Sequence, residues 1–182
     1  ALITPMWSKE DLKQMVQREI GDHRLIVVSN RQPYIHELLD GELRYTVPAG
    51  GLTTALDPLM QESGGTWIAH GGGSGDWSAV DGDNKIMVPP DNPAYALRLV
   101  RLTEEEERGY YHGFSNTALW PLCHNAYTEP VFNVDDWETY RSVNQEFANQ
   151  VLDEIDGRPA TVFTQDYHLA LLPRLLREAD PD

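Results

Sequence analysis

Three side chains able to bind polar ligands each stand just past a short apolar run typical of a buried strand: Arg31, His70 and Asp166. In an open parallel sheet, ligands bind beyond the carboxyl ends of the strands. The sequence therefore predicts that these three side chains meet at one edge of a sheet. Arg31 can bind an anion there through two parallel hydrogen bonds, whereas a plain surface arginine is the alternative.

The pair Gly50–Gly51 precedes a predicted helix over residues 51–59. A helix N-terminus exposes unpaired backbone N–H groups with partial positive charge, and glycine lets a ligand oxygen approach them closely. Together with Arg31, this arrangement indicates a phosphorylated ligand. Gly-Gly is also common in plain strand-to-helix turns, so both interpretations stay open from this stretch alone.

Aromatic and polar residues alternate in the segment GYYHGFSNTALWPLCH, residues 109–124. Aromatic rings with interleaved polar groups suit the apolar faces and hydroxyl rims of sugars. The same composition suits the edge of an ordinary core, and the segment taken alone favours the core interpretation.

Two loops flank the predicted site. Residues 33–39 and 42–47 surround Asp40–Gly41 and predict a β-hairpin, which either covers a ligand or is decoration. Residues 70–77, HGGGSGDW, are a flexible glycine-rich loop that lacks the Gly-Lys-Ser/Thr of a P-loop. The chain also lacks the GxGxxG pattern, which argues against a Rossmann dehydrogenase.

The elements that must position these residues alternate between strands and helices, which predicts one α/β domain with a mostly parallel sheet. Strands are expected over residues 25–28, 65–69, 85–88, 95–102 and 160–164, and helices over residues 8–20, 51–59, 104–112, 135–155 and 169–179. Capping residues support two of the helix starts, at Ser8 with Asp11 and at Thr103 with Glu106.

Composition excludes several classes of protein. The 182 residues carry 14 Lys and Arg against 29 Asp and Glu, a net charge of -15, which argues against nonspecific binding to nucleic acid or to an anionic membrane surface. The single cysteine, Cys123, cannot form an internal disulfide and fits a reducing cytoplasm. The first twenty residues do not have the pattern of a signal peptide, and no run is long enough to span a membrane.

Five motifs in order resemble the trehalose-6-phosphate synthase family of retaining glycosyltransferases: SNR, AGGL, YYHGFSNTALWPLCH, DWETYRSVNQEFA and DYHLALLP. The resemblance implies the GT-B arrangement, in which two Rossmann-like domains face each other across a cleft. It implies transfer of glucose from UDP-glucose to glucose 6-phosphate, a step in trehalose biosynthesis associated with osmoprotection. It implies neither a cofactor nor a metal, and it leaves a homo-oligomer open.

The resemblance covers about residues 24–178 and only the N-terminal part of that enzyme. We therefore expect an N-terminal helical extension over residues 1–23 and an incomplete acceptor-side Rossmann-like domain over residues 24–182. The nucleotide-sugar domain, with its Arg/Lys pair, is expected outside this sequence. On this interpretation residues 1–182 alone do not turn over UDP-glucose.

The resemblance assigns roles residue by residue. Arg31 matches the arginine that grips the acceptor phosphate, and Asp166 matches the aspartate that hydrogen-bonds the acceptor hydroxyls. Gly51, with Gly50 beside it, matches the loop glycine near the donor phosphates and the transferred sugar. Gly51 and Asp166 are thereby assigned to the catalytic centre.

Aromatic residues complete the acceptor site that the resemblance implies. Tyr111 and Trp120 match the aromatic pair that lines it, while Tyr167 and His168 are expected to buttress it. Retention without an enzymic nucleophile implies front-face displacement, in which the leaving phosphate helps to deprotonate the acceptor hydroxyl. The protein then acts by positioning and by stabilising charge.

The chain departs from the family pattern at His70, where the family usually has tryptophan, and in the adjoining loop 71–77. Both are expected near the acceptor pocket and put the acceptor in question. One alternative is transfer to another phosphorylated acceptor, such as a polyol phosphate, as in glucosylglycerol-phosphate synthase. Another is a noncatalytic sugar-phosphate sensor that kept the pocket.

Overall fold

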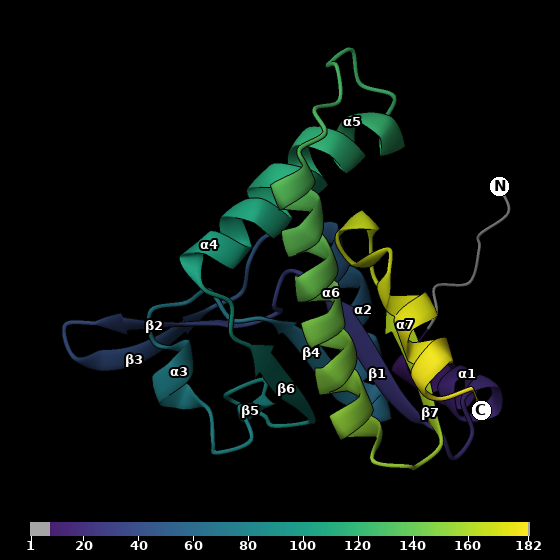
Figure 1. The fold of residues 1–182 in the computed structure, drawn as a ribbon. Helices are drawn as coiled ribbons and strands as arrows, with labels where there is room; N and C mark the ends of the chain where they lie inside the picture. Colours follow the sequence, from purple (N-terminus) through teal and green to yellow (C-terminus); the bar gives the residue numbers. More distant parts are fainter. Residues whose placement is uncertain (1–7, 182) are drawn as a thin grey trace, which may run out of the picture.

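The structure, a computed structural model, describes residues 8–181 (Figure 1). The strands are β1 Arg24–Ser29, β2 Ile35–Leu39, β3 Glu42–Thr46, β4 Thr66–His70, β5 Lys85–Val88, β6 Tyr95–Val100 and β7 Ala160–Thr164. The longer helices are α1 Lys9–Glu19, α2 Gly51–Ser63, η1 Arg108–Leu119, α6 Val134–Ile155 and α7 Leu172–Ala179. Short helical segments are α3 Asp76–Ala79, α4 Glu104–Glu107, α5 Trp120–Cys123 and η2 Tyr167–Leu169.

The central sheet has the strand order β5-β6-β4-β1-β7, and all its pairs are parallel except β5 with β6. In the register of the sheet, Val28 lies opposite both Ile68 and Thr164. The carboxyl ends of β1, β4 and β7 therefore lie level with one another at one edge. The predicted α/β class with a mostly parallel sheet is confirmed.

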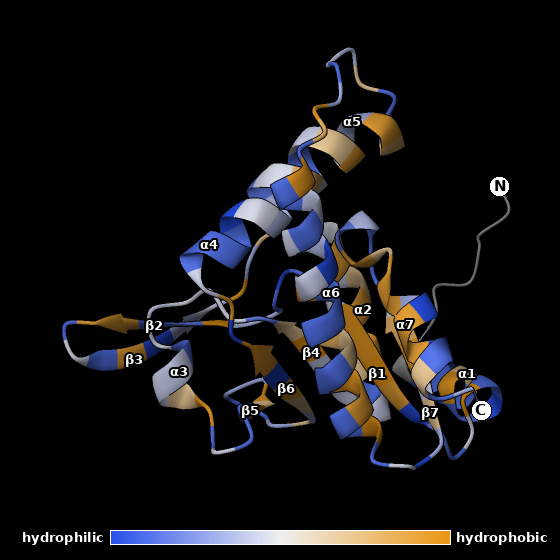
Figure 2. Cartoon of the chain, viewed as in Figure 1, coloured by the Kyte–Doolittle hydropathy of each residue, from blue (hydrophilic) through white to orange (hydrophobic). Residues whose placement is uncertain are grey.

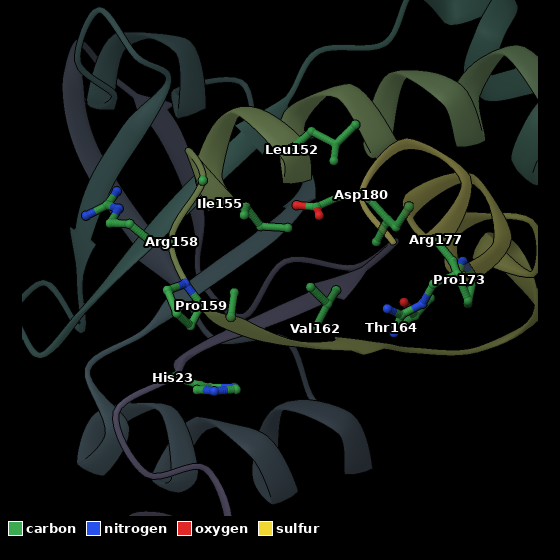
Figure 3. A pocket seen from close by; sticks show the side chains of 13 residues that line it. His23, Leu152, Ile155, Arg158, Pro159, Val162, Thr164, Pro173, Arg177 and Asp180 are labelled. Atoms are coloured by element: carbon green, nitrogen blue, oxygen red, sulfur yellow. The ribbon is translucent and has the colours of Figure 1, made fainter. Parts of the chain in front are cut away.

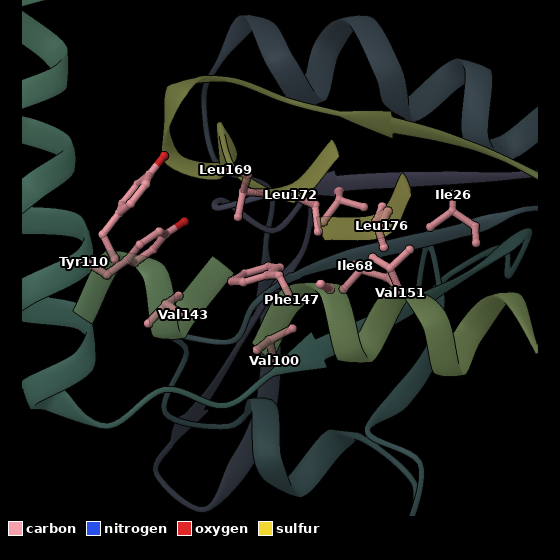
Figure 4. Close-up of a cluster of buried hydrophobic side chains, with 13 residues drawn as sticks. Ile26, Ile68, Val100, Tyr110, Val143, Phe147, Val151, Leu169, Leu172 and Leu176 are labelled. Atoms are coloured by element: carbon pink, nitrogen blue, oxygen red, sulfur yellow. The ribbon is translucent and has the colours of Figure 1, made fainter. Parts of the chain in front are cut away.

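Helices cover both faces of this sheet and make three layers. Along β1, Ile26 and Val28 pack toward α6 and α7, whereas Leu25 and Val27 pack toward α2. This explains why β1 is apolar at successive positions, since both of its faces are buried (Figure 2). Figure 4 shows the core on the α6 side, which includes Ile26, Ile68, Val100, Tyr110, Val143, Phe147, Val151, Leu169, Leu172 and Leu176.

The helix that was predicted over residues 104–112 is much longer than expected. It begins at the Thr103 capping box, continues as a twelve-residue π-helix, η1, and ends in α5 at Cys123. Gly109 and Gly113 bring it against α6, because a Cβ at either position would lie within 3.0 Å of Thr139 or Asp136. Tertiary packing thus extends the helix through glycines that local propensity disfavours.

Helix α2 also exceeds its predicted end at Leu59. It passes through Pro58 and stops at Gly64, which has the left-handed φ of 67°. Met60 is fully buried against the second core, so packing outweighs the helix-breaking tendency of the proline here. The predicted hairpin is confirmed as β2 and β3, paired antiparallel around Asp40 and Gly41.

Within residues 8–181, no helix combines the length and apolar character required to cross a membrane.

Candidate active site at the carboxyl edge of the sheet

The backbone that carries Arg31 is fixed by its neighbours at the carboxyl edge. The Trp67 indole donates to Ser29 Oγ at 2.8 Å, and that hydroxyl donates to the Arg31 carbonyl at 2.6 Å. From the next strand, the His70 N–H donates to the Asn30 carbonyl at 3.2 Å. Arg31 thus extends from a restrained turn, although its side chain is exposed.

The Arg31 side chain meets Tyr111 from helix η1. Its Nη2 lies 3.5 Å from the Tyr111 hydroxyl, and this contact raises the pKa of the guanidinium. The Tyr111 ring in turn stacks on His168, with ring centroids 5.4 Å apart and planes at 17°. An exposed cation beside a phenol hydroxyl supplies several donors to one anion.

Trp120 joins the same group through a chain of rings. It stacks on His124 at 5.0 Å, and His124 meets the edge of Tyr167 at 5.8 Å. Tyr111 and Trp120 are nine residues apart along this helical segment. In an α-helix nine residues make about two and a half turns, which would put the two side chains on opposite sides. The wider turn of the π-helix makes them about two turns, which puts both side chains on the same side. Trp120 is 41% exposed, so its ring is available to a ligand.

Asp166 follows the end of β7, two residues before His168. Its φ of 72° is unusual for a residue other than glycine, and its carboxylate accepts from the Tyr167 N–H at 2.8 Å. Burial lowers the pKa of His168, while Asp166 raises it and Arg31 lowers it further. Asp166 and Arg31 thus follow the ends of the paired strands β7 and β1, and both influence the pKa of His168.

His70 and the glycine pair are placed differently. His70 ends β4, and burial lowers the pKa of its ring despite the nearby Glu107 and Asp76. The backbone of His70 is linked to the Arg31 turn by the hydrogen bond from its N–H to the Asn30 carbonyl. Gly50 and Gly51 begin α2 and are exposed, and a Cβ at either position would meet nothing, so their backbone is open to a ligand.

Sequence reasoning missed a buried network beneath the hairpin, centred on Asp76. The carboxylate is fully buried in the glycine-rich loop and binds Gln32 and His36. Its only signal in the sequence was an acidic residue within a run of glycines.

A hollow of about 790 Å³ lies elsewhere, along the outer edge of β7 (Figure 3). It is lined by residues of β7, α6 and α7, among them Val162, Ile155 and Leu176. None of the predicted site residues lines it. In the described part of the chain, no cluster of three or more His, Cys, Asp or Glu side chains is arranged to hold a metal ion.

Comparison with known proteins agrees with the geometry. The profile of glycosyltransferase family 20 matches residues 23–182. Trehalose-6-phosphate synthase of Mycobacterium avium is 38% identical over 163 residues, which make up 89% of this chain and 32% of that protein. The chain thus spans about a third of the length of the curated relatives it matches.

Two solved structures are similar over 86% of this chain. The UDP-forming alpha,alpha-trehalose-phosphate synthase of Burkholderia xenovorans, in complex with glucose-6-phosphate, has a TM-score of 0.61, 27% identity and 31% of its own chain covered. A structure described as trehalose-6-phosphate from E. coli bound with UDP-2-fluoro glucose has a TM-score of 0.64, 26% identity and 30% covered. The resemblance that the five motifs predicted is confirmed, and the chain belongs to glycosyltransferase family 20.

Proposed function

We propose that this chain forms the acceptor side of a glucosyltransferase that moves glucose from UDP-glucose to glucose 6-phosphate with retention, giving trehalose 6-phosphate. The observation that carries the proposal is the pairing of Arg31 with Tyr111 at the carboxyl edge, where Asp166 follows the neighbouring strand β7. The relatives that bind glucose-6-phosphate and UDP-2-fluoro glucose support both substrate classes.

In this proposal each side chain has a distinct task. Arg31 and Tyr111 bind the acceptor phosphate, Trp120 packs against the sugar, and Asp166 accepts hydrogen bonds from its hydroxyls. The exposed N–H groups at Gly50 and Gly51 face the donor phosphates and the transferred glucose. The reaction is a front-face displacement, so the protein works by holding the acceptor hydroxyl close to the anomeric carbon.

The domain division is part of the same proposal. We infer that residues 24–182 belong to the acceptor-side domain of a longer enzyme whose nucleotide-sugar domain lies outside this sequence, and that residues 1–23 are an extension. Two observations support this: the chain spans about a third of the length of its relatives, and β7 is the edge strand of the sheet, beside a hollow of mixed polar and apolar lining.

The proposal is tested by assaying the full-length protein with UDP-glucose and glucose 6-phosphate. We expect release of UDP together with trehalose 6-phosphate, whose two α-configured anomeric protons are identified by NMR. A product with the inverted configuration at the transferred glucose, or no transfer to any phosphorylated acceptor, contradicts the proposal. Binding of glucose 6-phosphate without any transfer supports the sensor instead.

The second candidate, transfer to a smaller phosphorylated acceptor, is favoured by one observation. Histidine replaces the usual tryptophan at position 70, and it offers less apolar area against a hexose ring. Replacing His70 by tryptophan is therefore expected to shift preference toward glucose 6-phosphate over glycerol 3-phosphate, changing the ratio of kcat/KM values by about tenfold. The measurement is a competition between the two acceptors.

His70→Phe serves as the control for simply filling the space with an aromatic ring of smaller area. It is expected to shift the ratio in the same direction by less. An unchanged ratio in both folded variants means that His70 does not set the acceptor, and specificity then lies in loop 71–77 or in the hairpin.

A further inference from the structure

Asp76 is the most completely buried charged group next to the site, with no exposed surface. Its Oδ2 accepts from Gln32 Nε2 and from the Gly73 N–H, both at 2.7 Å, and its Oδ1 accepts from the His36 N–H at 2.8 Å. Although burial raises the pKa of Asp76, the His36 ring, whose Nδ1 lies 3.5 Å from Oδ1, and these hydrogen bonds outweigh it and hold the pKa below its usual value. One carboxylate thus connects three separate segments: the Arg31 turn, strand β2 and the glycine-rich loop.

The glycine-rich loop lies directly against strand β2 around this carboxylate. The Gly75 N–H donates to the His36 carbonyl at 2.9 Å, and the Leu38 N–H donates to Ser74 Oγ at 3.1 Å. At Gly73 a Cβ would lie 2.2 Å from the His36 carbonyl oxygen, so only glycine allows this approach. The loop and hairpin therefore form one unit, which we call the hairpin–loop unit, residues 35–46 and 71–76.

This unit reaches the acceptor site through Gln32. That side chain follows Arg31 directly, is buried to 4% exposure, and gives its amide N–H to Asp76. Two other hydrogen bonds hold the backbone of the turn at Asn30 and Arg31: the Ser29 hydroxyl donates to the Arg31 carbonyl, and the His70 N–H donates to the Asn30 carbonyl. The hydrogen bond from Gln32 to Asp76 holds the residue that follows Arg31. The backbone is therefore restrained on both sides of Arg31.

We propose that Asp76 is a positioning residue for the acceptor-phosphate site: it holds Gln32, and thereby Arg31, at the angle needed to bind phosphate. The inference rests on the proposed function. It also assigns a role to the hairpin, whose function the sequence left open, and to the glycine-rich loop, which departs from the family pattern. Together they bury Asp76, which binds Gln32 next to Arg31.

The test uses three variants of the full-length enzyme. Asp76→Asn keeps the shape but sets an amide N–H against the donors of Gln32 and Gly73. Gln32→Met keeps the length and volume of the side chain but removes the donor, and disturbs the loop less. Glu154→Gln is the matched control, since Glu154 is another buried carboxylate, 3% exposed, that binds Arg24 and Lys85 at the opposite end of the sheet.

We expect Asp76→Asn and Gln32→Met each to raise the acceptor KM by about tenfold while kcat and the KM for UDP-glucose stay close to wild type. The rise should be similar for glucose 6-phosphate and glycerol 3-phosphate, because Arg31 binds the phosphate that both share. Glu154→Gln is expected to lower stability without changing the acceptor KM.

An unchanged acceptor KM in folded Gln32→Met overturns the inference, and so does an equal rise in Glu154→Gln, which would show general destabilisation. A rise for only one acceptor places Asp76 at the sugar and not at the phosphate, and also overturns it. The proposed function fails separately, if the wild-type enzyme transfers glucose to neither acceptor.

Discussion

Replacing Arg31 by alanine in the full-length enzyme is expected to weaken acceptor binding by about 2–4 kcal/mol, or roughly 30- to 1,000-fold in KM. Arg31 lies beside Tyr111 at the carboxyl edge, with its Nη2 3.5 Å from that hydroxyl. Alanine removes the planar donor group and leaves the phosphate with only Tyr111. The measurement is the KM for glucose 6-phosphate at saturating UDP-glucose.

Two controls separate phosphate binding from general damage. Arg31→Lys keeps the charge but not the two parallel donors, so it should restore only part of the loss. Weak transfer to unphosphorylated glucose should be equally slow in wild type and Arg31→Ala, because no phosphate is present to be lost. If Arg31→Ala leaves the KM for glucose 6-phosphate unchanged, Arg31 is a plain surface residue.

The position of the site was predictable because it depends on strands alone. A buried parallel strand has a strong apolar pattern, and the edge at which its carboxyl end lies follows from chain direction. Arg31 and Asp166 therefore both stand at this edge, just past β1 and β7, which are paired in register. His70 ends the neighbouring strand as predicted, yet strand position does not determine where its ring points, and the ring is largely buried.

The aromatic segment shows where local pattern fails. Tyr110 is buried in the core while its neighbour Tyr111 faces Arg31, so the core interpretation holds for Tyr110, and the sugar interpretation stays a prediction for the rest of the segment. Which aromatic rings lie on the same side of η1 depends on the number of residues per helical turn. The π-helix is set by packing against α6 across Gly109 and Gly113, contacts that are distant in sequence.

The Asp76 network was missed for a related reason. Its partners Gln32 and His36 precede it by 44 and 40 residues, so no spacing rule connects them. An acidic residue in a glycine-rich loop normally reads as solvated, and only the paired hairpin creates the cavity that buries it. Hydrogen bonds between distant segments are visible in the fold and not in the pattern.

The second large effect concerns stability and centres on Glu154, at the end of the sheet opposite the site. Its carboxylate lies 2.7 Å from Lys85 Nζ, 3.0 Å from Arg24 Nη2 and 3.3 Å from Arg98 Nη1, and it accepts from Thr66 Oγ1 at 2.9 Å. Glu154→Gln removes the negative charge that these three cations share. We expect the unfolding free energy at pH 7 to fall by about 3 kcal/mol.

The pH dependence gives this prediction a distinctive sign. Burial raises the pKa of Glu154, but Lys85, Thr66 and Arg24 outweigh it and hold the pKa below its ordinary value of 4.5. The unfolded chain therefore takes up the proton more readily, so the stabilisation is present above about pH 4.5 and is lost as the pH falls through the folded pKa. Urea unfolding of the full-length protein, followed by tryptophan fluorescence, should show the difference between wild type and Glu154→Gln shrinking in acid.

Glu138→Gln is the matched control, since Glu138 pairs with Arg141 at 3.0 Å on the exposed face of α6. It makes the same chemical change on the same helix. The unfolding free energy should fall by less than about 1 kcal/mol at every pH, because the pair is exposed to solvent. Equal costs for the two variants would mean that the ion cluster at Glu154 is as weakly coupled as a surface pair. If the difference in unfolding free energy between wild type and Glu154→Gln stays the same in acid, the shape of the Glu154 side chain, and not its charge, is what stabilises the fold.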